Sequence, residues 1–244
     1  MHEIALVLVG FVVAFIGTMS GGGAGLLTLF TLIAFGLPTS QAIATNKFGD
    51  LGFFLPAVRN FSRAKQIKKK YLPAIITINI LGVTLGTLAL THINADFLRK
   101  IIAVVLLLIV FISLKKPNYA STERRARKPW PFVYFLTSIS SGALGAGTGI
   151  LSTMTLMYFR GLTALQAMAH SFYANSIGAV ISLGILVFAD LINYKYGLCL
   201  LVGNIIGAHF GSKLAIKKGN NFVRVMTAVL AVTVAIQLLV VKSK

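Results

Sequence analysis

The sequence has very few acidic residues, five Asp and Glu in 244 residues, against 23 Lys and Arg. Only Asp50 falls well inside an apolar run, so a pair of carboxylates for general acid–base catalysis is missing. There is no phosphate-binding loop and no nucleophile elbow, and the four histidines do not have the spacing of a metal site. We therefore expect that the protein is not an enzyme and that it uses no metal and no cofactor.

Cysteine is almost absent as well. The one cysteine, Cys199, lies inside an apolar run, which excludes an internal disulfide and a cysteine-rich metal site. The N-terminus, Met1-His2-Glu3, lacks the basic region of a cleaved signal peptide. We expect the first apolar run to remain in the mature protein.

Apolar residues, in contrast, are abundant. They make up 57% of the chain, only 11% of residues are charged, and the mean hydropathy is +0.86. Successive apolar runs are long enough to cross a bilayer, so we predict an all-α polytopic membrane protein with about eight transmembrane elements. The net charge of +18 comes from Lys and Arg between these runs, where they orient the chain in the membrane. The lipid bilayer is thus the expected partner, and nucleic acid is not.

The apolar pattern predicts short helices at 4–16, 25–35, 131–144 and 149–160, and longer ones at 41–60, 73–91, 97–114, 164–188, 195–215 and 221–241. The first two helices do not reach the roughly 20 residues of a full span. The basic, proline-flanked segment 115–130 is a linker. We divide the chain into a first transmembrane repeat, 1–114, the linker, and a second repeat, 131–244.

The two halves are copies of each other, because a shift of 125 positions superimposes them without a gap. The matches extend over both glycine clusters and far downstream: Gly17 with Gly142, Gly22 with Gly147, Gly36-Leu37 with Gly161-Leu162, Gln41-Ala42 with Gln166-Ala167, Asn79 with Asn204, Gly82 with Gly207, Gly86 with Gly211, and Phe97 with Phe222. One constant offset over so long a stretch is hard to obtain by chance. We infer an internal duplication.

The loop charges orient the two repeats. The loop 61–71 is strongly basic, whereas its equivalent, 186–196, holds Lys195 as its only basic residue. The loop 92–96 has no Lys or Arg, whereas its equivalent in the second repeat carries Lys217 and Lys218. Opposite bias at equivalent loops predicts inverted topology, with three spans and a glycine-broken hairpin in each half. Loops 61–71, 115–130 and 216–220 then face the cytoplasm, and both termini face outward. In the alternative, each broken element crosses once and the halves are parallel.

Each repeat contains a glycine break, at Gly17 to Gly25 and at Gly142 to Gly149. Glycine disfavours a helix by about 1 kcal/mol per residue, so a run of glycines ends one helix and starts another. Short helices beginning near Ala24 and Thr148 would point their N-terminal amides at an anion inside the protein. The candidate residues are Ser20, Gly21, Gly22, Gly23 and Gly25, and Gly147, Thr148 and Gly149. The alternative is that these glycines only allow close packing, which is the interpretation we favour for Gly82/Gly86 and Gly207/Gly211.

A polar constellation follows each break, Thr45-Asn46-Lys47 with Asp50 and, 125 positions later, His170-Ser171-Phe172 with Asn175. Lys47 and Asp50 share a helix face and could form a structural ion pair. In the functional interpretation, Lys47 contacts an anion, Asp50 carries a proton, and Thr45, Asn46 and Ser171 hydrogen-bond substrate oxygens, with Asn175 completing the set. His170 is a second candidate for proton coupling, or a structural histidine.

These residues resemble the TauE/SafE family, the sulfite and organosulfonate exporters. The resemblance rests on the Gly17 to Gly25 cluster, Gly36-Leu37-Pro38 and Ala42-x-Ala44-Thr45-Asn46, with a weaker second copy, and it covers essentially the whole chain. It implies a bacterial-type permease of the cell membrane for small anions such as sulfite or sulfoacetate. Thr45 and Asn46 match the family pattern, and His170-Ser171 departs from it.

We therefore predict a secondary transporter that moves a small anion by alternating access at a midplane site, with sulfite or an organosulfonate as the solute. The alternatives are a permease for another small anion, such as a carboxylate, and a membrane scaffold or accessory subunit without transport. A homo-oligomer is compatible with the sequence.

Overall fold

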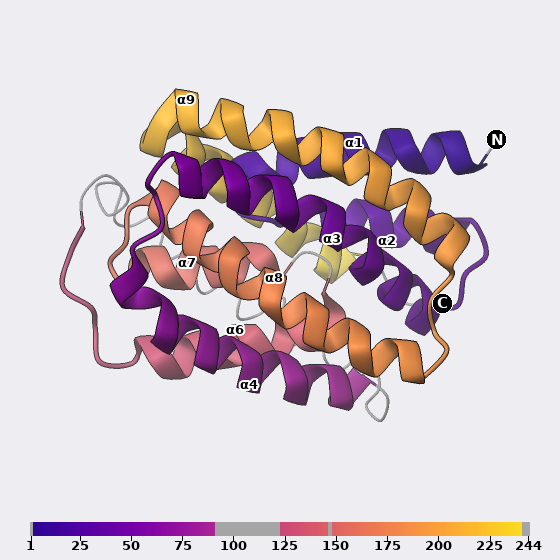
Figure 1. Cartoon of the computed structure of the whole chain (residues 1–244), viewed down its shortest axis with the longest axis horizontal. Coiled ribbons are helices and arrows are strands. Elements are labelled where there is room, and N and C mark those ends of the chain that lie inside the picture. Colours follow the sequence, from indigo (N-terminus) through magenta and orange to yellow (C-terminus); the bar gives the residue numbers. More distant parts are fainter. Residues whose placement is uncertain (1, 91–122, 146–147, 241–244) are drawn as a thin grey trace.

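The computed structural model describes residues 2–90, 123–145 and 148–240, and these parts are helical with short connections (Figure 1). The helices are α1 (His2–Ser20), α2 (Gly25–Ala34), α3 (Thr39–Arg63), the 3-10 helix η1 (Lys69–Tyr71), α4 (Leu72–Leu90), α6 (Trp130–Leu144), α7 (Gly149–Tyr158), α8 (Ala164–Phe188) and α9 (Tyr194–Val240). No strand occurs in the described ranges. The predicted helix 97–114 and residues 115–122 of the linker lie outside them.

Most predicted helix boundaries agree with the structure, but the predicted end of the first helix does not. α1 was expected to end at residue 16, but it continues to Ser20 and is long and apolar enough to cross a membrane. Gly17 is helical, and in the same turn the hydroxyls of Thr18 and Ser20 donate to the carbonyls of Ala14 (2.8 Å) and Ile16 (2.7 Å) within the helix. The break begins only at Gly21, where φ is +91°. α9 consists of two helices joined at Gly219, close to the predicted boundary.

The duplication is visible in the backbone. Both bounds of α8 lie 125 positions after those of α3. The left-handed residues repeat with the same offset: Gly36 (φ +90°) with Gly161 (+81°), and Lys65 (+56°) with Asp190 (+51°). Left-handed φ is uncommon for residues other than glycine, so its recurrence at equivalent positions shows that the two halves share one backbone design.

Equivalent helices run in opposite directions. The early part of α3 meets the late part of α8, where Lys47 hydrogen-bonds Ser182, and the late part of α3 meets the early part of α8, where Phe61 packs on Phe172 with ring centroids 5.9 Å apart. In Figure 1, α3 runs from right to left and α8 from left to right. The repeats are therefore inverted, as the loop charges predicted.

Each repeat packs into the other. α1 lies along the first part of α9, and α4 lies along α6. A Cβ added at Gly207 would be 2.1 Å from the Phe11 carbonyl oxygen, and one at Gly86 would be 2.0 Å from the Ile139 carbonyl oxygen. These glycines thus serve close helix packing, which is the role we favoured for them.

Both broken elements are hairpins that return to their starting side. His2, at the start of α1, stacks on Phe35 after the end of α2, with ring centroids 4.3 Å apart. In the second repeat, the Arg160 guanidinium after α7 lies 5.3 Å from the ring centroid of Trp130, the first residue of α6. The structure therefore excludes the alternative in which each element crosses once.

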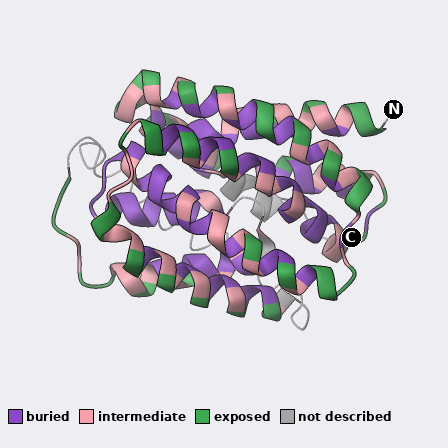
Figure 2. Ribbon diagram, viewed as in Figure 1, coloured by how far each residue is buried: buried purple, intermediate pink, exposed green. Residues whose placement is uncertain are grey.

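The basic loops gather at one end of the helices, which we call the basic end. Lys68 pairs with Glu123 there, the Arg124 N–H donates to the Gly161 carbonyl (2.8 Å), and the Leu165 N–H donates to Asn220 Oδ1 (2.9 Å). These contacts bring segments 61–71, 123–130 and 216–220 together. The other end, which we call the opposite end, holds the start of α1 and the pair Lys195–Glu3 (2.6 Å). Between the ends, buried residues face inward and outward faces carry exposed apolar side chains suited to lipid (Figure 2).

Gly207→Ala should destabilise the contact between α1 and α9, because the added Cβ would collide with a backbone oxygen. Overpacking of this kind costs about 1–3 kcal/mol. Thermal unfolding in detergent should show a clear decrease in Tm. Gly184→Ala is the control, since nothing lies within 4 Å of a Cβ at Gly184; equal stability of the two variants would contradict this packing.

Glu123→Gln should reduce stability slightly at neutral pH and not in acid. The hydrogen bond from Lys68 lowers the pKa of Glu123, and partial burial opposes this shift. The carboxylate therefore contributes stability above its unfolded pKa of about 4.3 and loses it as the pH falls through its lowered folded value. For a partly exposed pair the contribution is within about 1 kcal/mol. The Tm difference from the parent should shrink below about pH 4; a difference independent of pH would exclude this pair as its cause.

Candidate functional site

Two adjoining chambers lie between α3 and α8 near the middle of the protein. Each has a volume of about 40 Å³, and the residues common to both are Asp50, Phe54, Ser141, Gly145 and Asn175. Asp50 and Asn175 are equivalent residues of the two repeats. Each lies eleven residues into a helix of 25, about 16 Å along a rod of about 37 Å. The chambers are therefore at the depth expected of a midplane site.

The tips of both hairpins reach the first chamber. Gly17, Gly22, Ala24 and Gly25 line it from the first hairpin, and Gly145 and Gly149 from the second. The two tips touch, since a Cβ at Gly149 would be 3.1 Å from the Gly22 carbonyl oxygen, and Thr153 Oγ1 donates to the Gly21 carbonyl at 3.1 Å. Gly21 and Gly22 have φ values of +91° and +92°, which only glycine adopts readily.

The first turns of α2 and α7 face this chamber without a side-chain cap. α2 begins at Gly25 and α7 at Gly149, and neither Ala24 nor Thr148 caps the helix with a side-chain hydrogen bond. The Thr148 hydroxyl donates instead to the Gly145 carbonyl (2.9 Å). An uncapped helix N-terminus presents free N–H groups and a partial positive charge. The N-termini of α2 and α7 therefore both lie at the first chamber.

Lys47 lines the second chamber and is buried, with 5% of its surface exposed. Its Nζ donates to the Gly142 carbonyl near the C-terminus of α6 and to Ser182 Oγ of α8 (2.8 Å). The carbonyls at a helix C-terminus are unpaired and carry partial negative charge, which suits an ammonium group. The predicted ion pair between Lys47 and Asp50 is thus not found within 4.0 Å in the described part of the chain, because the ammonium group reaches α6 and α8 instead.

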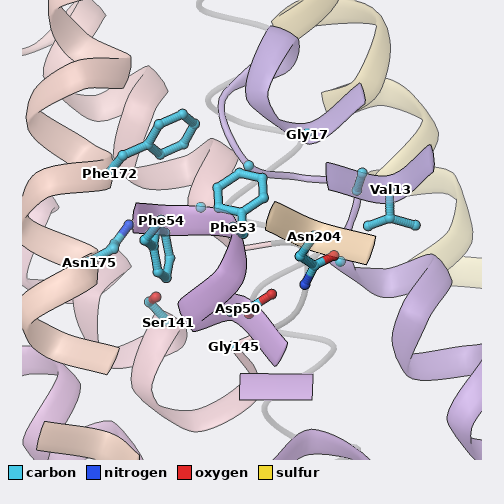
Figure 3. A pocket seen from close by; sticks show the side chains of 14 residues that line it. Val13, Gly17, Asp50, Phe53, Phe54, Ser141, Gly145, Phe172, Asn175 and Asn204 are labelled. Carbon is cyan, nitrogen blue, oxygen red and sulfur yellow. The ribbon is translucent and has the colours of Figure 1, made fainter. Parts of the chain in front are cut away.

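Amide side chains lie around the two chambers, which together we call the cavity. Asp50 accepts from Asn46 Nδ2 at 3.3 Å, and Asn175 Oδ1 accepts from Asn79 Nδ2 at 2.9 Å. Asn204 donates to the Gly49 carbonyl at 2.8 Å, while its Oδ1 has no hydrogen-bond partner. Figure 3 shows Asp50 and Asn204 on one side of Phe53 and Phe54, and Asn175 and Ser141 on the other. The cavity thus combines charged, amide and hydroxyl groups with an aromatic wall.

The structure brings only part of the predicted site together. The predicted residues that line the chambers are Gly22, Gly25, Lys47, Asp50, Gly149 and Asn175. Those outside the lining are Ser20, Gly21, Gly23, Thr45, Asn46, Thr148, His170 and Ser171, and Gly147 is outside the described residues. Thr45 Oγ1 accepts the Asn193 N–H (3.0 Å) and fixes the loop before α9, and Ser171 accepts from Asn175 (3.3 Å). Ser171 therefore positions a lining residue.

His170 lies at the basic end, away from the chambers. Its Nδ1 is 2.7 Å from the Gln166 carbonyl, and its Nε2 is 3.1 Å from the Lys68 backbone nitrogen. Both ring nitrogens are thus engaged by backbone groups, and the side chain anchors the loop before α4. This geometry favours the structural alternative over proton coupling.

Several lining residues were not predicted from the sequence, namely Asn204, Ser141, Ser182 and the aromatic residues Phe53, Phe54 and Phe172. Asn204 also joins two helices through its bond to the Gly49 carbonyl. The equivalent of Ser141 is Ile16, so the repeat gave no signal for it. The 125-residue offset pairs Phe172 with Lys47, and this difference between the two repeats was the one sequence signal that pointed to Phe172 as a lining residue.

Comparisons with known proteins agree with these features. A family profile described as "Sulfite exporter TauE/SafE" matches residues 6–238. A "Probable membrane transporter protein ORF9" from Sinorhizobium sp is 28% identical, covering 98% of this chain and 93% of its own length. A "Probable membrane transporter protein" from Haemophilus influenzae is 29% identical, covering 93% and 90%, and "Probable membrane transporter protein YfcA" from Escherichia coli is 27% identical, covering 96% and 88%.

No solved structure matches the chain. The family profile, however, spans nearly all of it, and the described helices include four that are long and apolar enough to cross a membrane. The chain therefore belongs to the sulfite exporter TauE/SafE family and is a membrane transporter.

Proposed function

We propose that the protein is a secondary transporter of small anions, with sulfite or an organosulfonate-type sulfur compound as its solute. The observation that carries this proposal is the meeting of two uncapped helix N-termini at the first chamber, with the buried Lys47 lining the adjoining second chamber. The anion binds between the hairpin tips and is exposed to each side of the membrane in turn. The inverted repeats supply the symmetry that such alternating access uses.

The lining suits an oxyanion. Backbone N–H groups at Gly25 and Gly149, the Asn175 amide and the Ser141 hydroxyl supply hydrogen-bond donors, and Lys47 supplies the compensating charge. A water molecule needs about 10–15 Å³ of such volume, so each chamber of about 40 Å³ holds only a few waters or one small solute. This size favours sulfite over larger sulfonates.

Charge balance points to Asp50 as the proton carrier. Lys47 and Asp50 together are neutral, so an anion that enters a buried cavity adds one uncompensated negative charge. A proton on Asp50 restores neutrality, and the carboxyl group has only one described donor, Asn46. We infer that one monovalent anion moves with one proton, and that His170 takes no part in this coupling.

Two alternatives differ in testable ways. A permease for a carboxylate would use the same donors, because carboxylates and sulfur oxyanions share oxygen acceptors. A scaffold or accessory subunit without transport has no need for uncapped helix ends around a cavity, so the site itself argues against it.

We place the protein in the cell membrane of a bacterium with the basic end in the cytoplasm, following the positive-inside rule. Loops 61–71 and 115–130 are then cytoplasmic. A homo-oligomer remains a prediction.

Lys47→Met should reduce sulfite transport at least tenfold in kcat/KM, because the anion loses the one buried cationic partner among the described lining residues. The measurement is counterflow of labelled sulfite in proteoliposomes, with a small carboxylate and a small sulfonate as competing solutes. Lys195→Met is the matched control, since Lys195 is an exposed lysine at the opposite end. Equal flux in both variants would remove Lys47 from the site, and counterflow of only the carboxylate would establish the alternative.

Asp50→Asn should uncouple transport from protons. An asparagine keeps the size of the side chain but cannot take up a proton, so sulfite exchange should persist while a pH gradient no longer drives net uptake or release. His170→Gln should retain the response to the gradient. The account would be wrong if His170→Gln lost this response and Asp50→Asn kept it.

A further inference from the structure

Lys47 and Phe172 occupy equivalent positions on either side of the cavity. Each is the ninth residue of its helix, about 12 Å from the helix start. The two helices are antiparallel (Figure 1). α3 starts at the opposite end, and α8 starts at the basic end. Lys47 therefore lies between the cavity and the opposite end, and Phe172 lies between the cavity and the basic end.

Both side chains reach across to a hairpin tip. A Cβ at Gly145 would be 2.9 Å from Lys47 Cε, and a Cβ at Gly22 would be 3.3 Å from Phe172 Cε1. Lys47 thus touches the hairpin of the second repeat from α3 of the first, and Phe172 does the reverse. The two contacts join equivalent helix positions to hairpin tips, although Gly145 and Gly22 are not equivalent residues, and their chemistry differs.

The contact on the Lys47 side is a polar network that joins four helices. Lys47 Nζ of α3 donates to the Gly142 carbonyl of α6 and to Ser182 Oγ of α8 (2.8 Å). Thr87 Oγ1 of α4 is 2.8 Å from Ser182 Oγ and donates to the Gly142 carbonyl at 3.3 Å. The two hydrogen bonds that Lys47 donates are stronger than bonds between neutral groups, because their donor is an ammonium group.

The contact on the Phe172 side is aromatic. Phe172 is fully buried and makes edge contacts with Phe53 (5.2 Å between ring centroids) and Phe61 (5.9 Å), and a tilted contact with Phe54 (6.4 Å). Phe53 and Phe54 also line the cavity. The rings lie on the basic-end side of the cavity, and the contacts that the structure describes among them involve no charged side chain.

We propose that Lys47 and Phe172 are the two gates of the transporter, a polar gate toward the opposite end and an aromatic gate toward the basic end. An anion in the cavity can replace the Gly142 carbonyl and the Ser182 hydroxyl as partner of the Lys47 ammonium, so substrate binding releases the polar gate. This last step rests on the proposed function, whereas the position of the gates does not. The aromatic gate opens by rotation and separation of rings and needs no exchange of charge.

The test is side-specific labelling of a cysteine in the cavity. Cys199→Ser removes the native thiol, and Ser141→Cys places a nearly isosteric one where both chambers meet. A membrane-impermeant thiol reagent is applied to vesicles of each orientation, with Lys65→Cys and Asn193→Cys reporting the basic and opposite ends. Phe172→Ala should raise the labelling rate at least tenfold from the basic end only. Lys47→Met should do so from the opposite end only.

Two further variants keep the test decisive. Ser182→Ala removes one Lys47 partner and should give a smaller increase from the opposite end. Val180→Ala changes an outward-facing residue of the same helix and should give none. Equal increases from both sides for Phe172→Ala and Lys47→Met, or no increase for either, would overturn the proposal. Added sulfite should speed labelling of the parent from the opposite end; if it does not while the variants remain side-specific, the gates stand and the substrate assignment fails.

Discussion

The structure depends on one constraint, that unpaired backbone groups cannot face lipid. Each glycine break leaves such groups at a hairpin tip, where some of them pair within the tip, as the Gly22 N–H does with the Gly17 carbonyl (2.7 Å). Inverted duplication solves this problem, because it brings the two tips together in the interior, where Gly22 meets Gly149 and Thr153 donates to Gly21. α3 and α8 then enclose the tips. The same buried, uncapped helix ends that are costly for folding are the groups to which we assign anion binding.

Function arises where the two repeats differ. The backbone is duplicated closely, down to the left-handed Lys65 and Asp190, but the side chains at the cavity are not. Asp50 corresponds to Asn175, so among the described lining residues only the first repeat contributes an acidic group, and Lys47 corresponds to Phe172. In the transport cycle that we propose, a symmetric framework gives the two access states similar energies, and unequal side chains give each state its own trigger. This division explains how a duplicated fold can have sided chemistry.

Hydropathy and the 125-residue offset were sufficient to predict nearly all helices, the duplication and the inversion, because these depend on local composition and loop charge. The direction of individual side chains was not predictable. Lys47 and Asp50 share a helix face, yet Lys47 turns to Gly142, a residue 95 positions away. His170 has an equivalent in Thr45, but its ring binds the backbone of Lys68. Ser141 and Asn204 enter the site only through tertiary packing.

The most direct test of the account is to locate the bound anion itself. Selenite has the charge and shape of sulfite and scatters X-rays anomalously, so a crystal structure of the protein with selenite would show where it binds. The account predicts one anomalous peak between Gly25 and Gly149, within hydrogen-bond distance of Asn175 or Lys47. A peak confined to the surface lysines of the basic end, or no peak at concentrations that inhibit sulfite counterflow, would contradict it.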